Sequence, residues 1–265
     1  MNYKTITVAD RNLNQGAVRT ITLHRPERRN AMTPEMQLEL ISALEETAAT
    51  GARVLVLTGA DNAFCSGLDI SVLKSMQGKS AIEYRADAEH ISRLFLALYE
   101  QQIPTIAAVH GPAIAGGAGL AIICDFTLAT PEAKFGFTEV RIGFVPALVS
   151  AFLALHIDGK HCRDLLLTGR IVDAEEAFRM GLVNEIVPHE QLAMRVESLA
   201  EELLANSPES IAATKRLLAT QHRPWLAVAI KAALEANAQS RETVDFREGV
   251  AAFLEKRKAV WNSGQ

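Results

Sequence analysis

A glycine-rich apolar run at residues 103–146 limits the possible folds more than any other part of this chain. It reads IPTIAAVHGPAIAGGAGLAIICDFTLATPEAKFGFTEVRIGFVP: a strand-like segment, a loop with four glycines, a second apolar run, and one carboxylate, Glu139, among apolar neighbours. Small residues let backbone N–H groups come close to a ligand, and a lone acid in apolar surroundings is a candidate proton carrier. The run predicts a buried strand leading to a site suited to enolate chemistry.

Strand and helix patterns alternate over the first 190 residues. Residues 3–9 and 17–24 are rich in Thr, Val and Ile and predict a hairpin joined by a polar turn at 10–16. Thr33 is expected to cap a helix that has Pro34 at its first position, and the apolar segment 53–59 predicts a strand buried on both faces. Further strands are expected at 105–111, 125–131 and 182–188, and Asp173 with Glu176 is expected to start a helix that Gly181 ends. This alternation predicts the α/β class.

The strand patterns stop after about residue 190. Ser207–Pro208, Pro224, and Asp245 with Glu248 are each expected to start a helix. The sequence therefore predicts an α/β core over residues 1–200 and a helical C-terminal region over residues 201–265.

Composition limits the partners and the compartment. The chain has 265 residues, 49% of them hydrophobic, which suits one large globular domain or a domain with a smaller appendage. A net charge of −4 gives no basic excess for nucleic acid or an anionic membrane. Cys65, Cys124 and Cys162 form neither a disulfide framework nor a C-x-x-C metal pair. With no secretion signal or membrane span recognisable, a cytoplasmic protein is expected.

Two loops of small residues, 65–69 and 115–119, each follow a buried-strand pattern. The unpaired amides at a helix start accept negative charge well, so these loops could each give one N–H to a carbonyl oxygen. Alternatively, their glycines only permit tight turns. No GK[ST] phosphate loop and no G-x-G-x-x-G fingerprint is present, so ATP and NAD are not expected.

Six segments in one order and spacing carry a resemblance that spans essentially the whole chain. The sequence resembles the crotonase superfamily, the enoyl-CoA hydratase/isomerase family. The segments are RPERRNAM (25–32), VLVLTGADNAFCSGLDI (54–70), PTIAAVHGPAIAGGAGLAIICD (104–125), AKFGFTEVRIGFVP (133–146), LLLTGRIVDAEEAFRMGLVNEIVP (165–188) and EGVAAFLEKRKAVW (248–261).

The resemblance implies a crotonase-like spiral of ββα units and a C-terminal helical region that builds homotrimers, often paired into hexamers. It also implies an acyl-CoA substrate, with coenzyme A carried as part of the substrate and no metal or other cofactor.

By motif position, the resemblance assigns the oxyanion hole to the amides of Leu68 and Gly116 and the acid–base role to Glu139. The residues implied in substrate and CoA binding are Arg28, Ser66, Gly67, Asp69, Ile70, Gly117, Phe253 and Lys256. Phe253 and Lys256 match positions that reach the adenine end of CoA, often in the next subunit.

One position departs from the family's hydratases. They carry two glutamates, and Gly119 stands where the first is expected. Because hydration uses both acids and double-bond isomerisation needs one, the departure favours isomerisation modestly. A hydratase with a substitute acid, a decarboxylase, and a catalytically weak CoA-binding scaffold stay open as alternatives. The groups considered as possible substitutes are Asp61, Asp69, Glu83, Glu89 and His110.

Overall fold

A six-stranded sheet forms the centre of the computed structural model, which describes residues 3–75 and 78–261. The two N-terminal strands form an antiparallel hairpin, and every later neighbouring pair is parallel. In spatial order the strands are β1 (Ile6–Leu13), β2 (Gly16–Leu23), β3 (Ala52–Gly59), β4 (Thr105–Val109), β6 (Phe126–Ala129) and β9 (Glu185–Ile186).

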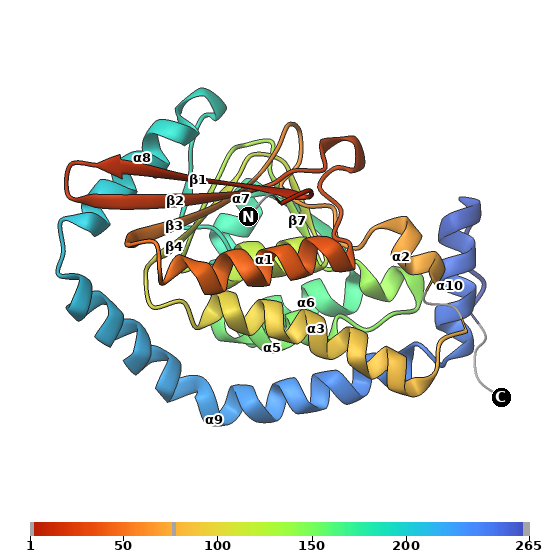
Figure 1. The fold of residues 1–265 in the computed structure, drawn as a ribbon. Helices are drawn as coiled ribbons and strands as arrows, with labels where there is room; N and C mark the ends of the chain where they lie inside the picture. The colour runs from red at the N-terminus through yellow and green to blue at the C-terminus, as the bar shows by residue number, and fades with distance from the viewer. Residues whose placement is uncertain (1–2, 76–77, 262–265) are drawn as a thin grey trace.

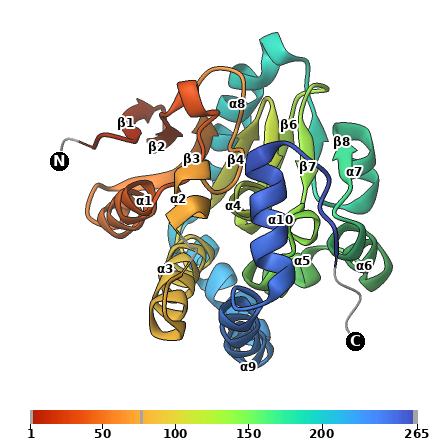
Figure 2. The same ribbon diagram turned by 90° about the vertical axis from the view of Figure 1, so that its right-hand side faces the viewer.

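Strand β3 is buried on both faces, as its continuous apolar pattern predicts. Val54 and Val56 pack with the core beneath helix α8 (Leu192–Leu204), whereas Leu55 and Leu57 face the larger core on the opposite side. Figures 1 and 2 show α8 on one side of the sheet and α1 (Pro34–Thr47) and α3 (Ala81–Tyr99) on the other. The helices on both faces exclude water from the central strands.

A second, three-stranded sheet lies beside the first and was not predicted. It contains β5 (Pro112–Ile114), β7 (Lys134–Gly136) and β8 (Ile171–Asp173), with β5 and β7 parallel and β7 and β8 antiparallel. Pairing of β5 with β7 places the glycine loop beside the segment that leads to Glu139.

The other helices lie between and around the two sheets (Figure 1). They are α2 (Ile70–Ser75), α4 (Gly116–Ile123), α5 (Ala147–His156), α6 (Gly159–Thr168), α7 (Ala174–Met180), α9 (Pro208–Ser240) and α10 (Val244–Glu255), with short 3₁₀ turns η1 (Pro26–Arg28), η2 (Glu139–Ile142) and η3 (His189–Gln191). Within the described ranges, no helix is both long enough and apolar enough to cross a bilayer.

Two predicted helix starts are confirmed. The Thr33 hydroxyl accepts a hydrogen bond from the Met36 amide at 3.2 Å, and the Asp173 carboxylate accepts one from the Glu176 amide at 2.8 Å. Gly181 ends α7 in the left-handed conformation, with φ of +86°. Local capping chemistry therefore sets these boundaries.

Several predicted boundaries are wrong. The strands predicted at 105–111, 125–131 and 182–188 are shorter in the structure, at Thr105–Val109, Phe126–Ala129 and Glu185–Ile186. The hairpin strands extend to Leu13 and Gly16, so the turn is only Asn14–Gln15. Pro224 does not start a helix but lies inside the continuous α9, which changes direction along its length in Figure 1. The cap of α10 is Thr243, whose hydroxyl accepts from the Phe246 amide at 3.1 Å, rather than Asp245.

The C-terminal helices pack on the core of their own chain. α9 lies against α3 and α5, and α10 lies against η2. In Figure 2, α10 runs across the front of the molecule, above the end of α9. The division of the chain near residue 200 stays a prediction, but both helices contribute to the site described next.

Candidate active site

The two small-residue loops meet because β3 and β4 are parallel neighbours. The carboxyl ends of adjacent parallel strands lie at the same edge of a sheet, and each loop leaves one of these ends. The Ile114 amide donates to the Cys65 carbonyl at 2.9 Å, and the Cys65 amide donates to the Pro112 carbonyl at 3.0 Å. The loops therefore run side by side.

The Leu68 amide faces away from its bridge partner. Met32 forms a parallel bridge to Leu68: the Met32 amide donates to the Gly67 carbonyl at 2.7 Å, and the Asp69 amide donates to the Met32 carbonyl at 2.9 Å. In such a bridge the central residue's own N–H points to the opposite side. The Leu68 N–H therefore makes no hydrogen bond to Met32 and points away from it.

The Gly116 amide lies at the start of α4, where helical N–H groups have no partner within the helix. Ala115 precedes it with φ of +52° and ψ of −123°, a strained backbone conformation for a residue with a side chain. The Ala115 amide donates to the Gly136 carbonyl at 2.7 Å, which helps to hold that conformation. The strain turns the chain sharply into the helix immediately before Gly116.

Close backbone packing requires glycine at position 117. A Cβ on Gly117 would collide with the Cys65 carbonyl oxygen and lie 2.7 Å from the Cys65 Cβ. Gly67 has φ of +88°, and a Cβ there would lie 3.1 Å from the Ile114 carbonyl oxygen. The small residues therefore bring the Leu68 and Gly116 segments together.

Glu139 begins η2, three residues after β7. Its Oε2 atom is buried and has no hydrogen-bond partner in the described part of the chain. Burial raises the pKa of this carboxyl from 4.5 to about 7, because the charged form loses solvation and no cation compensates for it. A carboxyl with this pKa can both accept and donate a proton near neutral pH.

A cavity of about 140 Å³ joins Glu139 to the two loops. Among the described residues that line it, Glu139 is the only ionisable one. The other lining residues are mainly apolar: Met32, Ser66, Leu68, Leu73, Ile91, Phe95, Ile114, Ala115, Gly116, Thr138, Ile142, Phe144, Val145, Ala147, Leu148, Val149, Asn237 and Phe253. The arrangement suits an apolar acyl group beside one proton carrier.

The space around Gly119 is filled. A Cβ on this residue would lie 2.9 Å from Phe95 Cζ and 2.9 Å from Val149 Cγ1. Phe95 and Val149 both line the cavity, whereas Gly119 does not. Two hydrophobic side chains therefore separate position 119 from the cavity.

None of the possible substitutes for a second acid lines the cavity. Asp69 pairs with Arg25 at 2.9 Å, Glu83 caps α3 through Ser80, and Glu89 pairs with Arg85 at 2.9 Å. His110 Nε2 lies 2.6 Å from the Asp61 carbonyl oxygen, and burial lowers the His110 pKa.

Arg28 and Ser66, which the resemblance assigns to CoA binding, lie next to each other. The Ser66 hydroxyl makes a long hydrogen bond of 3.4 Å to the Arg28 carbonyl, and the Arg28 side chain is exposed. Asp69 caps α2 by accepting from the Ser71 amide at 2.8 Å. Ile70 begins α2, but its side chain lies outside the described part of the chain.

Phe253 and Lys256 lie in different surroundings. Phe253 on α10 lines the Glu139 cavity of its own chain, while Lys256 ends that helix in the left-handed conformation and is exposed. One functional candidate was missed: Asn237 on α9, which is buried and lines the cavity. A polar residue within a buried helical stripe was the signal that could have identified it.

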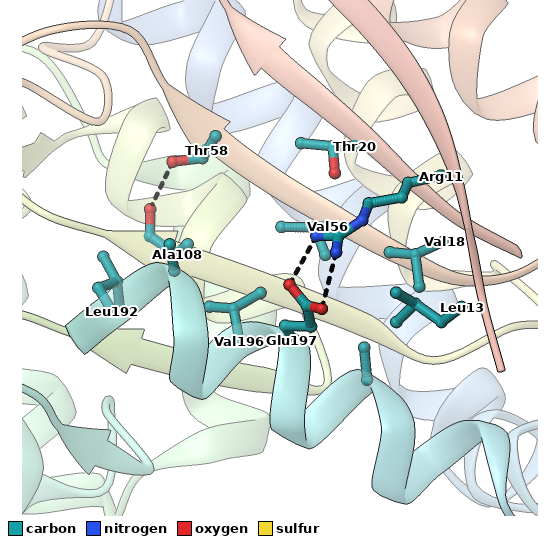
Figure 3. A pocket seen from close by; sticks show the side chains of 12 residues that line it. Arg11, Leu13, Val18, Thr20, Val56, Thr58, Ala108, Leu192, Val196 and Glu197 are labelled. Carbon is teal, nitrogen blue, oxygen red and sulfur yellow. Dashed lines mark hydrogen bonds and ion pairs between the residues drawn. The ribbon is translucent and has the colours of Figure 1, made fainter.

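A separate cavity of about 270 Å³ lies between the sheet and α8 (Figure 3). Its lining is mostly aliphatic, and Arg11 of β1 forms two hydrogen bonds with Glu197 of α8, at 2.6 and 2.9 Å. It holds none of the predicted site residues, so the candidate active site is the Glu139 cavity.

Solved structures share this architecture over nearly the whole chain. A protein described as a putative enoyl-CoA hydratase from Mycobacterium avium paratuberculosis K-10 superposes with a TM-score of 0.86 at 30% identity, covering 97% of this chain and 99% of the other. An enoyl-CoA hydratase/isomerase from Xanthobacter autotrophicus Py2 gives 0.86 at 29% identity, covering 97% and 98%. The fold is thus that of the crotonase superfamily.

Sequence comparison identifies the family. The profile of the enoyl-CoA hydratase/isomerase family matches residues 14–264. A putative enoyl-CoA hydratase of Thermus thermophilus is 45% identical over 92% of this chain and 97% of its own length, and a crotonyl-CoA hydratase of Syntrophomonas wolfei is 33% identical over 89% and 91%. The chain belongs to the enoyl-CoA hydratase/isomerase family and is an acyl-CoA enzyme of that type.

Proposed function

We propose that this enzyme acts on an enoyl-CoA through an enolate, with Glu139 as its single acid–base group, and that it moves a double bond from the β,γ to the α,β position. The observation that carries the proposal is one buried carboxylate without a hydrogen-bond partner among the described residues, in an otherwise uncharged cavity beside two small-residue loops. The coenzyme A portion arrives with the substrate, and the proposed chemistry uses no other cofactor.

In this mechanism the thioester oxygen accepts hydrogen bonds from the Leu68 and Gly116 amides. The Glu139 carboxylate removes a proton from the α carbon, and the electron pair delocalises into a dienolate whose oxygen the amides stabilise. The protonated Glu139 then returns the proton to the γ carbon, which forms the conjugated thioester. One carboxyl serves both steps because its pKa of about 7 suits either direction of transfer.

Hydration is the second candidate, favoured by the names of several relatives. It requires a positioned water in addition to a proton for the α carbon. Position 119 carries no carboxylate, and a side chain placed there would require Phe95 and Val149 to shift. This packing weights the proposal toward isomerisation.

The test compares the purified enzyme on a β,γ-enoyl-CoA, a conjugated enoyl-CoA and a malonyl-type thioester. We expect isomerisation to have the highest kcat/KM. Hydration of the conjugated substrate at a higher kcat/KM would reject the isomerase assignment, and decarboxylation as the main activity would do the same. If no acyl-CoA binds or reacts, the enzymatic proposal itself fails.

A further inference from the structure

The buried face of α9 changes character where it reaches the cavity. Its buried residues follow helical spacing and are apolar at Leu226, Ile230 and Ala233, but polar at Asn237 and Ser240. Figure 1 shows this C-terminal part of α9 running beneath α3, which supplies Ile91 and Phe95 to the same cavity. From the polar part of the stripe, Asn237 lines one wall of the candidate acyl site.

Asn237 is 4% exposed, and its Oδ1 atom is buried with no hydrogen-bond partner in the described ranges. A buried amide oxygen without a hydrogen-bond partner is unfavourable, and an apolar side chain in this place would avoid that cost. Together with Glu139 Oε2, it gives the cavity a second polar atom without a partner. A ligand group that forms a hydrogen bond would satisfy it.

Arg241 follows the last residue of α9, four positions after Asn237, and is 1% exposed. Its Nη1 lies 3.3 Å from Asp87 Oδ2, while Nε and Nη2 have no hydrogen-bond partner among the described residues. Its guanidinium lies 5.4 Å from the ring centroid of Phe144, which lines the cavity. Lys79 also pairs with Asp87, at 2.7 Å, so two cations share one carboxylate here. The net positive charge of Arg241, Lys79 and Asp87 near this side of the cavity favours a ligand oxygen that carries negative charge.

We propose that Asn237 determines specificity for acyl groups that carry an oxygen function remote from the thioester. A hydroxyl there donates to Asn237 Oδ1. A carboxylate accepts from the Asn237 amide nitrogen, and the positive charge of Arg241 favours it further. This inference rests on the proposed acyl-CoA function and adds the substrate class.

Matched enoyl-CoA series test it. The series are β,γ-enoyl-CoA thioesters with acyl chains of about five to eight carbons, each ending in a methyl, hydroxyl or carboxylate group, and kcat/KM is compared at equal chain length. We expect an oxygen-bearing terminus to be favoured over methyl by about 10-fold or more at the length that fits, since a site built around a hydrogen bond discriminates against its absence. Comparison of the hydroxyl series with the carboxylate series shows which of these two oxygen groups the enzyme prefers.

The matched variants are Asn237→Leu, which keeps the branching and the number of side-chain heavy atoms but has no polar atom, and Ser240→Ala, on the same buried stripe but outside the cavity. Asn237→Leu should reduce the ratio of kcat/KM for oxygen-bearing over methyl termini to about one, and Ser240→Ala should leave that ratio unchanged. If Asn237→Leu does not fold, the preference of the unaltered enzyme decides. Equal kcat/KM for all termini in that enzyme overturns this inference alone, whereas absence of any acyl-CoA turnover overturns the proposed function beneath it.

Discussion

The environment of a single carboxyl sets the expected pH dependence. Burial raises the Glu139 pKa to about 7, and the ionised form must begin the proposed reaction as a base. We therefore expect kcat/KM to rise with pH and level off above about 7 in the free enzyme. Initial rates measured between about pH 5 and 9 check this. A profile that stays flat across that range contradicts the role of Glu139 as the base.

Glu139 also links pH to stability. Its folded-state pKa, about 7, lies above its ordinary value of 4.5, so the folded protein holds this proton more tightly than the unfolded chain. Stability from this group is therefore complete at low pH and lost as pH rises through about 7. Glu139→Gln removes the ionisation and should stabilise the protein by about 1–3 kcal/mol above neutral pH, with little gain near pH 4.

Chemical denaturation at the two pH values measures this difference. Glu190→Gln, at an exposed glutamate, is the matched control and should change little. In the same preparations, Glu139→Gln should lower kcat by about 10²–10⁴-fold, because the neutral amide cannot transfer the proton. If Glu139→Gln neither lowers kcat nor stabilises the protein at high pH, Glu139 is not the buried acid–base group.

Substitutions at Gly119 test the proposal that a single carboxyl does the acid–base work. Gly119→Glu alone should be destabilising and gain no hydratase activity, since its Cβ would meet Phe95 Cζ and Val149 Cγ1, each at 2.9 Å. Gly119→Glu with Phe95→Ala opens a path from position 119 to the cavity and should gain measurable hydration of a conjugated enoyl-CoA. Phe95→Ala alone is the control. Hydration by the single Gly119→Glu variant would contradict the packing argument.

At the scale of elements, the start of α4 must fit closely against the 64–68 loop. Gly117→Ala places a methyl group against the Cys65 carbonyl and should cost about 1–3 kcal/mol, with a loss of kcat because the Gly116 amide moves. Gly159→Ala is the matched control: it lies at the start of α6, where an added methyl group would meet no neighbour within 4 Å, and should be neutral or slightly stabilising. Thermal unfolding and initial rates of both variants test this expectation. Equal stability and equal kcat for the two variants would contradict the requirement for glycine at position 117.

The elements that could be predicted from the sequence are those with strong local signals. The continuous apolar run of β3 and the side-chain caps Thr33 and Asp173 act over a few residues, and the structure confirms them. The short strands β5, β7 and β8 have three residues each, too few for periodicity to reveal. Their pairing joins segments that are far apart in the sequence, so it depends on tertiary contacts.

Tertiary support explains the remaining differences. Proline normally interrupts a helix, yet α9 continues through Pro224, where packing of Leu226 and Ile230 holds the following turns. The candidate site also has parts with local sequence signals and parts that depend on tertiary contacts. Glu139 and the two glycine loops could be identified from sequence, whereas Asn237 could not be placed near Glu139, because the contact of α9 with α3 spans more than 100 residues of chain.

Across the whole molecule, the candidate site depends on elements from both ends of the chain. Met32 comes from the N-terminal part, Glu139 from the middle, and Asn237 and Phe253 from the last two helices. Loosening α9 or α10 would therefore open the cavity and hydrate Glu139, which would lower its pKa. Packing of the C-terminal helices and the chemistry of the site are linked by this geometry.

The first half of α9 has little support from its own chain, which bears on the predicted homotrimer or hexamer. Leu217 and Leu218 are 60% and 51% exposed, and apolar side chains grouped on one helix are typical of an interface. We expect light scattering to give a mass three or six times 28.8 kDa.

Leu217→Glu should lower that mass, because burial of a carboxylate in an apolar contact is unfavourable. Leu38→Glu, at a leucine on α1 that is 50% exposed, should not. A monomeric unaltered protein contradicts the oligomer prediction, and equal masses for the two variants exclude Leu217 from the interface.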